Sequence, residues 1–206
     1  MLEFLCMRAK IQQEAVPLEQ HIYIVISQTG TLLSRIIKLF TKAEYNHASI
    51  SLAPDLDVMY SFGRKHPYNP FWGGFVKESP HWGTFKRFSQ TRILVLDVAV
   101  TPEQYRQIQT RINTISTNRR YYHYNYWGLY LAAFRIPYRH KRSYYCSEFV
   151  NHLLARSEVE GAKNTRSIVQ PMHFLSLPEA KTLYRGRLID YSRFAAVYFA
   201  KKQAVC

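Results

Sequence analysis

Cysteine is scarce in this sequence, and the three residues present, Cys6, Cys146 and Cys206, lie far apart. A disulfide-stabilised scaffold needs more cysteines than this, and a structural zinc site needs closely spaced pairs of Cys or His ligands. We therefore expect no metal, no cofactor and no disulfide framework. A reducing compartment suits such a chain best.

Long apolar runs are also missing, so we expect no membrane-spanning helix. Residues 1–20 lack the continuous apolar core of a secretion signal, because Glu3, Arg8 and Lys10 interrupt their short apolar pieces. We interpret residues 1–20 as an N-terminal arm and residues 21–206 as a single domain, since a chain of 206 residues suffices for one full core. The expected location is cytoplasmic.

Acidic residues are few: 14 Asp and Glu stand against 28 Lys and Arg, which gives a formal net charge of +14. Such a surface attracts anions, and an anionic polymer or a membrane surface is the expected class of partner. The sequence contains no specific nucleic-acid reader motif, so the charge alone does not predict sequence-specific nucleic-acid binding.

The hydrophobic pattern indicates an α+β fold with an antiparallel sheet packed against helices. Residues 53–57 are short enough to join two neighbouring strands as a hairpin, and matching their apolar faces places Ile50 opposite Tyr60. We interpret residues 64–90 as one long, ordered loop, because Pro, Gly and aromatic residues mix there without a sustained period. The remaining predictions are strands at 21–27, 45–52, 58–63, 91–100 and 183–191, helices at 32–41, 101–116, 146–154 and 171–175, and a last strand or docking segment at 194–199.

Cys146 opens the helix predicted at 146–154, and the apolar residues Phe149, Val150, Leu153 and Leu154 place the thiol on or beside its inward face. Two interpretations follow. The thiol is a small buried hydrophobe, as most free cysteines are. Alternatively, the unpaired amides and the positive end of the helix stabilise a thiolate, which makes Cys146 a nucleophile.

His47 favours the second interpretation, because a cysteine nucleophile needs a base that is close in space rather than in sequence. It lies with Ser49 on the polar face of the strand predicted at 45–52. The hairpin register places Ser61 diagonally beside His47, so Ser61 is the predicted residue that orients the imidazole. Glu78 is the competing candidate for this role.

An Asn-His strand at Asn46 and His47, followed later by a Tyr-Cys-Ser-Glu helix start at residues 145–148, resembles the circularly permuted papain-like cysteine hydrolases. These are NlpC-type enzymes whose branch includes the YiiX-like amidases and the lecithin:retinol acyltransferases. The resemblance spans roughly residues 22 to 190 and rests on these two short motifs. Ser61 departs from the family, which usually has Glu, His, Asn or Gln in the third position.

The resemblance implies a papain-like fold, with Cys146 as nucleophile and His47 as base. It also implies a thiol-dependent amidase or peptidase that cleaves an amide or ester bond in a peptide, isopeptide or acyl-bearing substrate. An acyltransferase of the same fold is the nearer alternative. A non-catalytic basic module that binds nucleic acid or anionic membrane is the more distant one.

A basic and aromatic segment at 119–128 precedes Cys146, followed by a basic stretch at 135–142. Arginine and tyrosine interleaved in this way can stack single-stranded nucleic acid. The resemblance favours another interpretation, in which the first segment forms a wall of the active site. The second stretch favours a thiolate electrostatically and attracts anionic substrates.

Overall fold

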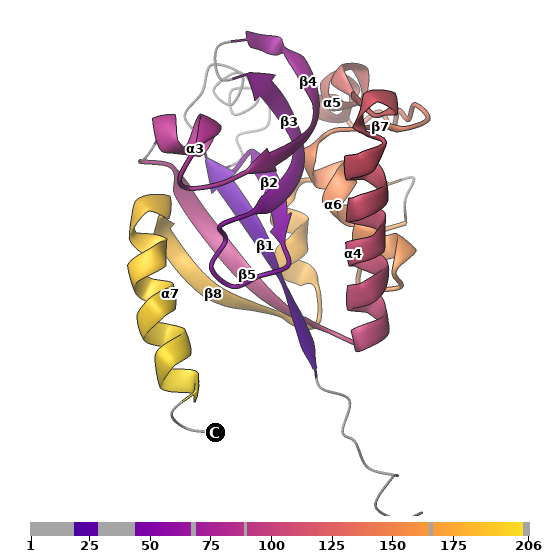
Figure 1. Cartoon of the computed structure of the whole chain (residues 1–206). Helices are drawn as coiled ribbons and strands as arrows, with labels where there is room; N and C mark the ends of the chain where they lie inside the picture. Colours follow the sequence, from indigo (N-terminus) through magenta and orange to yellow (C-terminus); the bar gives the residue numbers. More distant parts are fainter. Residues whose placement is uncertain (1–18, 29–43, 67–68, 89, 165–166, 204–206) are drawn as a thin grey trace, which may run out of the picture.

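A six-stranded antiparallel sheet forms the centre of the molecule in the computed structural model, which describes residues 19–28, 44–66, 69–88, 90–164 and 167–203 (Figure 1). The strand order is β4-β3-β2-β1-β5-β8, so the long central strands β1 and β5 are paired along nine residues each. The strands are β1 (Gln20–Gln28), β2 (His47–Ser51), β3 (Met59–His66), β4 (Asn69–Glu78), β5 (Arg92–Val100) and β8 (Ala180–Arg187).

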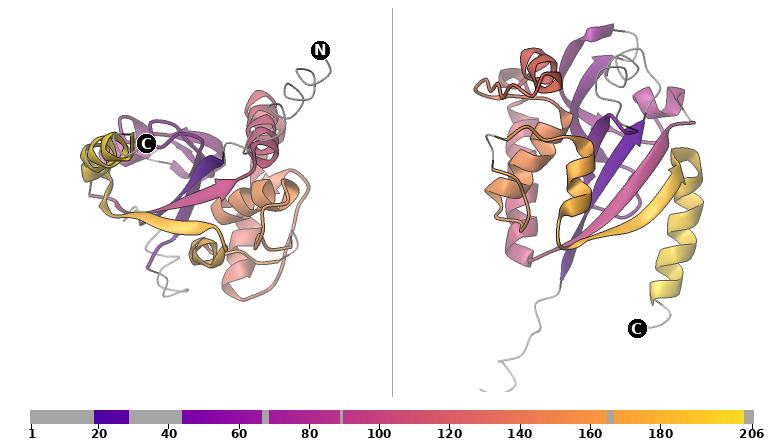
Figure 2. Two further views of the ribbon diagram at one scale, coloured as in Figure 1. Left: turned by 90° about the horizontal axis from the view of Figure 1, so that it is seen from below. Right: turned by 180° about the vertical axis from the view of Figure 1, so that it is seen from behind.

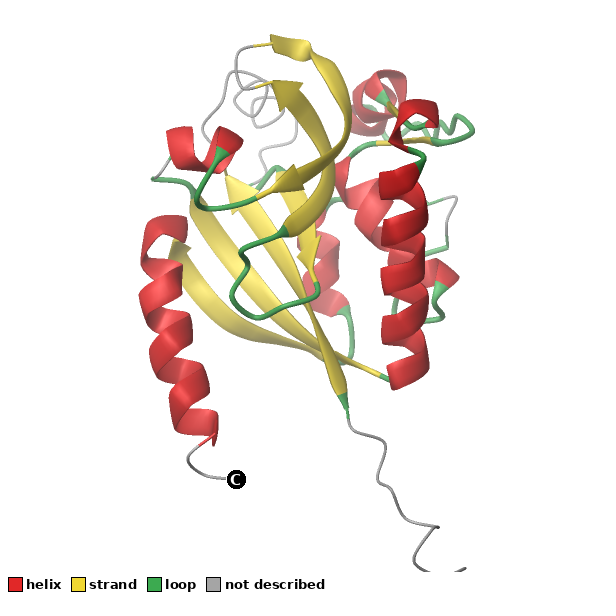
Figure 3. Cartoon of the chain, viewed as in Figure 1, coloured by secondary structure: helices red, strands yellow, loops and turns green. Residues whose placement is uncertain are grey.

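Helices cover both faces of this sheet (Figures 2 and 3). On one face lie α4 (Pro102–Thr117), α6 (Cys146–Arg156) and the 3₁₀ turn η2 (Pro171–Ser176); on the other lie α7 (Leu188–Gln203) and the short α3 (Gly83–Arg87). The α+β class and the antiparallel sheet packed against helices are therefore confirmed. No helix in the described ranges has the length and apolar character needed to cross a bilayer.

The sequence of strand β1 explains why helices pack on both faces of the sheet. Its residues alternate between the faces, so Ile22 and Ile24 join the cluster under α4 and α6, while Tyr23 and Val25 join the cluster under α7. All four side chains are buried. A strand buried on both faces has a continuous apolar sequence, which is the pattern seen here.

The helix predicted at 101–116 is confirmed as α4. Thr101 is its N-cap: the Thr101 hydroxyl accepts a hydrogen bond from the Gln104 backbone N–H at 3.2 Å, and Gln104 Oε1 accepts one from the Thr101 N–H at 2.9 Å. This reciprocal capping box satisfies two backbone donors that the helix itself leaves unpaired. The predicted register of the β2–β3 hairpin is also confirmed, with Ile50 opposite Tyr60.

The prediction that residues 64–90 form a long loop is wrong. β3 continues to His66, β4 occupies Asn69–Glu78 and α3 follows at Gly83–Arg87. Gly73 and Gly74 weaken the strand signal in the sequence, but β4 is an edge strand whose pairing with β3 supplies the missing stability, with Gly74 opposite Gly63.

The strand predicted near the C-terminal end of the chain is correct only as far as Arg187. The strand predicted at 183–191 ends there, and α7 replaces both its last residues and the strand considered at 194–199. Leu188, Tyr191 and Ala195 are buried, with spacings of three and four that belong to a helix. The helix predicted at 32–41 and nearly all of the arm at 1–20 lie outside the described residues.

A short parallel pairing brings the segment after α4 beside the start of α6. His123 and Tyr124 form β6 (His123–Tyr124), which pairs with β7 (Ser143–Tyr144) directly before Cys146. Between them lie α5 (Tyr126–Ala133) and the loop 134–142, and before them the 3₁₀ turn η1 (Arg119–Tyr121). The basic and aromatic segment is thus attached to the N-terminal end of the cysteine helix.

Candidate active site

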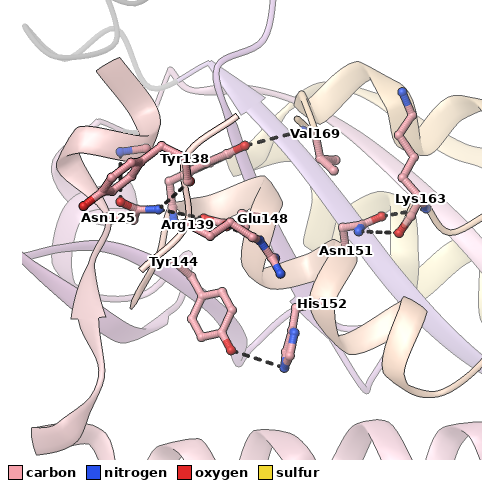
Figure 4. A network of polar contacts seen from close by, with 11 residues as sticks. Asn125, Tyr138, Arg139, Tyr144, Glu148, Asn151, His152, Lys163 and Val169 are labelled. Atoms are coloured by element: carbon pink, nitrogen blue, oxygen red, sulfur yellow. Dashed lines mark hydrogen bonds and ion pairs between the residues drawn. The ribbon is translucent and has the colours of Figure 1, made fainter. Parts of the chain in front are cut away.

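Cys146 is the first residue of α6, and a buried carboxylate fixes the helix start around it. Glu148 Oε2 accepts a hydrogen bond from the Tyr145 N–H at 3.3 Å, which satisfies a donor of the kind that helix starts leave unpaired. Glu148 is itself held by Asn125 Nδ2 at 3.3 Å and by Arg139 Nε at 3.2 Å (Figure 4). The position of the Cys146 backbone is therefore set by contacts from three separate segments.

The structure brings Cys146 and His47 together. His47 is the first residue of β2, and its side chain shares a hydrogen bond with the Cys146 thiol. The sulfur also lies 4.0 Å from the carbonyl oxygen of Asn46, the residue before His47. Two residues almost a hundred positions apart thus meet at the junction of a strand start and a helix start.

Glu78 holds the imidazole, so the prediction that Ser61 orients His47 is wrong. His47 Nε2 lies 3.0 Å from Glu78 Oε1 and 3.1 Å from Oε2, and the Ser49 hydroxyl donates to Oε2 at 2.5 Å. The Ser61 hydroxyl instead donates to the Ala48 carbonyl at 2.7 Å. Ser61 is opposite Val76 across the hairpin, and the next residue of β4 on that face is Glu78, whose longer, charged side chain takes the imidazole.

The contacts raise the pKa of His47 above that of Cys146, whose own pKa they lower. Burial alone lowers the pKa of His47, but the charge of Glu78 and the hydrogen bonds to Cys146 and Glu78 outweigh it and raise the pKa to about 10. Burial alone raises the pKa of Cys146, but the hydrogen bond and charge of His47 and the backbone groups of Ala48 and Ser147 lower it. The pair therefore favours a thiolate beside an imidazolium.

The three side chains of the site are largely shielded from solvent. Cys146 is 5% exposed, and the side chains of His47 and Glu78 are 15% and 13% exposed. Charged groups with so little solvent need partners, and each member of this row has one. With Nε2 facing Glu78, Nδ1 is the ring nitrogen available to the thiol.

Two tyrosines near the thiol differ in what their hydroxyls do. The Tyr145 hydroxyl accepts a hydrogen bond from the Val169 N–H at 3.4 Å. Tyr124, from β6, lies close enough to interact electrostatically with Cys146; burial and its neighbours, including Cys146, raise its pKa well above the usual value. Its phenol therefore stays protonated near neutral pH.

The sequence signals for the supporting residues were weak. Glu78 falls in the stretch interpreted as a loop, and Ser49 was placed on the polar face of its strand without a partner. Glu148 occupies the third position of its helix, where an acid after a cap residue is a recognisable sequence sign. Among the described residues, no cluster of three or more His, Cys, Asp or Glu side chains is arranged to hold a metal ion.

No protein-family model, curated protein or solved structure matches this chain. The chemistry of the site has to follow from the contacts of its own residues. A thiol at a helix start, a base in contact with it and a third group that holds the base are the three parts of an activated nucleophile.

Proposed function

We propose that the protein is a thiol-dependent hydrolase that cleaves an amide or ester bond, built on a circularly permuted papain-like fold of the NlpC type. The observation that carries the proposal is the row Cys146, His47 and Glu78, with a lowered thiol pKa and a raised imidazole pKa. An antiparallel sheet that supplies the histidine before a helix that supplies the cysteine supports the permuted order.

In the first half of the reaction, His47 holds the proton of Cys146 and the thiolate attacks the carbonyl carbon of the substrate. A carbon–sulfur bond forms, and the carbonyl electron pair moves onto the oxygen. When this intermediate collapses, the bond to the leaving amine or alcohol breaks and His47 gives the leaving group its proton. The product that stays behind is a thioester on Cys146.

In the second half, a water molecule resolves the thioester. His47, now neutral, takes a proton from the water as its oxygen attacks, and the carbon–sulfur bond breaks to regenerate the thiolate. Glu78 keeps the imidazole oriented and stabilises its charged form in both halves. A peptide, isopeptide or acyl-bearing substrate fits this chemistry.

Two kinds of donor are candidates for stabilising the developing oxyanion. The backbone N–H groups in the first turn of α6 have no carbonyl partner within the helix, and the Tyr124 phenol stays protonated. Both kinds of donor stabilise negative charge in a site from which water is largely excluded. We assign Tyr124 this role beside the Cys146 backbone N–H.

Alkylation with iodoacetamide tests the activated thiol without a known substrate. Because His47 lowers the pKa of Cys146, labelling of Cys146 should fall less steeply between pH 8 and pH 6 than labelling of an ordinary thiol. An ordinary thiol, for which Cys6 and Cys206 serve as references, loses about tenfold in rate per pH unit. We expect Cys146 to label at least about tenfold faster at pH 6 and to lose this advantage in His47→Ala.

Turnover of p-nitrophenyl acetate, followed by a panel of amide substrates, tests the catalytic role itself. Cys146→Ala and His47→Ala should each lower turnover at least about a hundredfold. Full turnover in either variant contradicts the proposal. If labelled acyl groups end on an added amine rather than on water, the protein is the acyltransferase of the same chemistry. A basic binding module would be indifferent to alkylation.

A further inference from the structure

Helix α5 is apolar on every side and yet lies at the periphery of the molecule (Figure 1). Its sequence, YWGLYLAA, contains no charged residue. Trp127 is 68% exposed, Tyr130 58%, Phe134 55% and Ile136 50%. A helix that is hydrophobic all round is normally buried. The described residues leave much of this one exposed, which is typical of a surface that binds a partner.

Three of the exposed side chains form a continuous aromatic surface. The rings of Trp127 and Tyr130 are 6.3 Å apart, and those of Tyr130 and Phe134 are 5.2 Å apart. Ile136 and Tyr138, on the loop that follows, are exposed as well. We call these five residues, Trp127, Tyr130, Phe134, Ile136 and Tyr138, the α5 platform.

The segment that carries the platform is rich in positive charge. No Asp or Glu occurs between Glu103 and Glu148, whereas eight Lys and Arg do. Arg135, Lys141 and Arg142 are exposed in the loop that carries Ile136 and Tyr138. Arg139 is partly exposed and pairs with Glu148. An apolar, aromatic centre with a cationic rim is the composition of a protein surface that binds a membrane interface.

We infer that the α5 platform is a docking surface for an anionic membrane. Trp and Tyr side chains favour the boundary between headgroups and acyl chains, where one end of the ring is apolar and the other is hydrated. The exposed Arg135, Lys141 and Arg142 would attract the phosphates of anionic headgroups. The aromatic and basic residues belong to one continuous segment of the chain, so both contributions favour docking of that segment.

Two other occupants fit this face less well. A symmetric dimer would bring the cationic rim of one copy against the same rim of the other, which is repulsive. Single-stranded nucleic acid would use the rings and the arginines but would leave the aliphatic Ile136 without an apolar partner. A membrane satisfies the aromatic, aliphatic and cationic residues together.

The platform is attached to the start of the cysteine helix at both ends. Asn125 caps α5, accepting from the Gly128 N–H at 2.8 Å, and its side-chain amide also donates to Glu148. Beyond α5, Arg139 donates to the same carboxylate (Figure 4). Docking on a membrane would therefore hold Cys146 at a defined height above the headgroups. This inference does not depend on the proposed hydrolase activity.

Co-sedimentation of the full chain with lipid vesicles tests the inference. We expect binding to phosphatidylcholine vesicles that contain roughly one third phosphatidylglycerol, and much weaker binding without the anionic lipid or at high salt. The double variant Trp127→Ser/Phe134→Ser should bind at least about tenfold more weakly, because it removes two large apolar side chains. The matched control, Ile189→Ser/Val197→Ser on α7, replaces residues of 55% and 54% exposure and should bind as the unaltered chain does.

Tryptophan fluorescence gives a local readout, since the chain has three tryptophans. In Trp72→Phe/Trp82→Phe, Trp127 is the only reporter, and its emission should shift to the blue with anionic vesicles and be quenched by brominated lipid. An unchanged spectrum, or equal binding by the α5 double variant and the α7 control, overturns the inference.

The other occupants have their own outcomes in the same experiments. A concentration-dependent dimer in sedimentation velocity that Trp127→Ser/Phe134→Ser abolishes would assign the platform to self-association and overturn the inference. Binding of a single-stranded oligonucleotide that the same variant abolishes, with vesicle binding unaffected, would overturn it as well. Cys146→Ala should bind vesicles normally, which keeps this result separate from any loss of catalysis.

Discussion

Glu78 determines the charge state of the candidate catalytic pair, although it contacts only His47 and Ser49 in the described hydrogen-bond network. Burial works against a charged imidazole, and the carboxylate of Glu78 is the largest of the opposing influences that raise the His47 pKa. The lowered pKa of Cys146 depends in turn on the charge and hydrogen bond of His47. One carboxylate thus acts on the thiol through the imidazole between them.

Glu78→Gln separates this charge from the hydrogen bond, because glutamine keeps the size of the side chain and an oxygen acceptor. The His47 pKa should fall and that of Cys146 should rise, so that fewer thiols are ionised below neutral pH. We expect iodoacetamide labelling of Cys146 at pH 6 to slow by about tenfold, with a smaller loss at pH 8. The measurement is the labelling rate across this pH range.

Ser61→Ala is the matched control, since Ser61 is buried on the same hairpin and its hydroxyl bonds the Ala48 carbonyl. It should cost about 1 kcal/mol of stability and leave the shape of the pH profile unchanged. A profile that moves in Ser61→Ala and stays in Glu78→Gln would return the orienting role to the serine.

At the scale of elements, Glu148 joins α6 to α5 and to the loop that carries Arg139 (Figure 4). Burial raises the pKa of this carboxyl, and its hydrogen bonds with Asn125, Arg139 and the Tyr145 N–H oppose that shift. The site therefore depends on contacts among three segments rather than on α6 alone.

Glu148→Ala should lower the free energy of unfolding by about 2–3 kcal/mol, because it removes the carboxylate acceptor of the buried Tyr145 N–H, of the Asn125 amide and of Arg139. Urea denaturation measures this change. Glu103→Ala is the control: Glu103 is also in the first turn of a helix, but it is more than half exposed and should cost less than about 1 kcal/mol. Equal losses in the two variants would show that Glu148 acts only as a first-turn acid.

Elements that are encoded by a few neighbouring residues could be predicted from the sequence. The helix start at Cys146, the strand that carries His47, the cap of α4 and the Ile50–Tyr60 register follow from spacing and turn length within short windows. From the sequence, Glu78 could be proposed only as an alternative to Ser61. The strand that positions it contains Gly73 and Gly74, which weaken the strand pattern, and its pairing with β3 is not visible in the sequence. Helix α7 was missed for a similar reason. Its apolar positions indicate a helix only when the sheet face that they cover is known.

At the scale of the whole molecule, the central sheet links two hydrophobic clusters into one structure. Phe149 of α6 belongs to the cluster on one face and Tyr191 of α7 to the cluster on the other, while β1 and β5 contribute alternate residues to both. Neither cluster can lose its packing without exposing one face of the same strands. We therefore expect the described part of the chain to unfold in a single cooperative transition.

Phe149→Leu and Tyr191→Leu test this expectation from the two faces. Both side chains are almost fully buried, and the Tyr191 hydroxyl also donates to the Pro54 carbonyl at 2.7 Å. Each substitution should cost about 1–3 kcal/mol and shift the urea midpoint without splitting the transition.

Two probes make the test sharp because they report on different regions. The three tryptophans lie between residues 72 and 127, so their fluorescence reports on β4, α5 and the loop between β4 and α3, while far-UV circular dichroism also reports on α7. The two curves should coincide in the unaltered chain and in both variants. If circular dichroism is lost before fluorescence in Tyr191→Leu, α7 unfolds on its own, and the sheet does not couple its two faces in the way that the alternation along β1 requires.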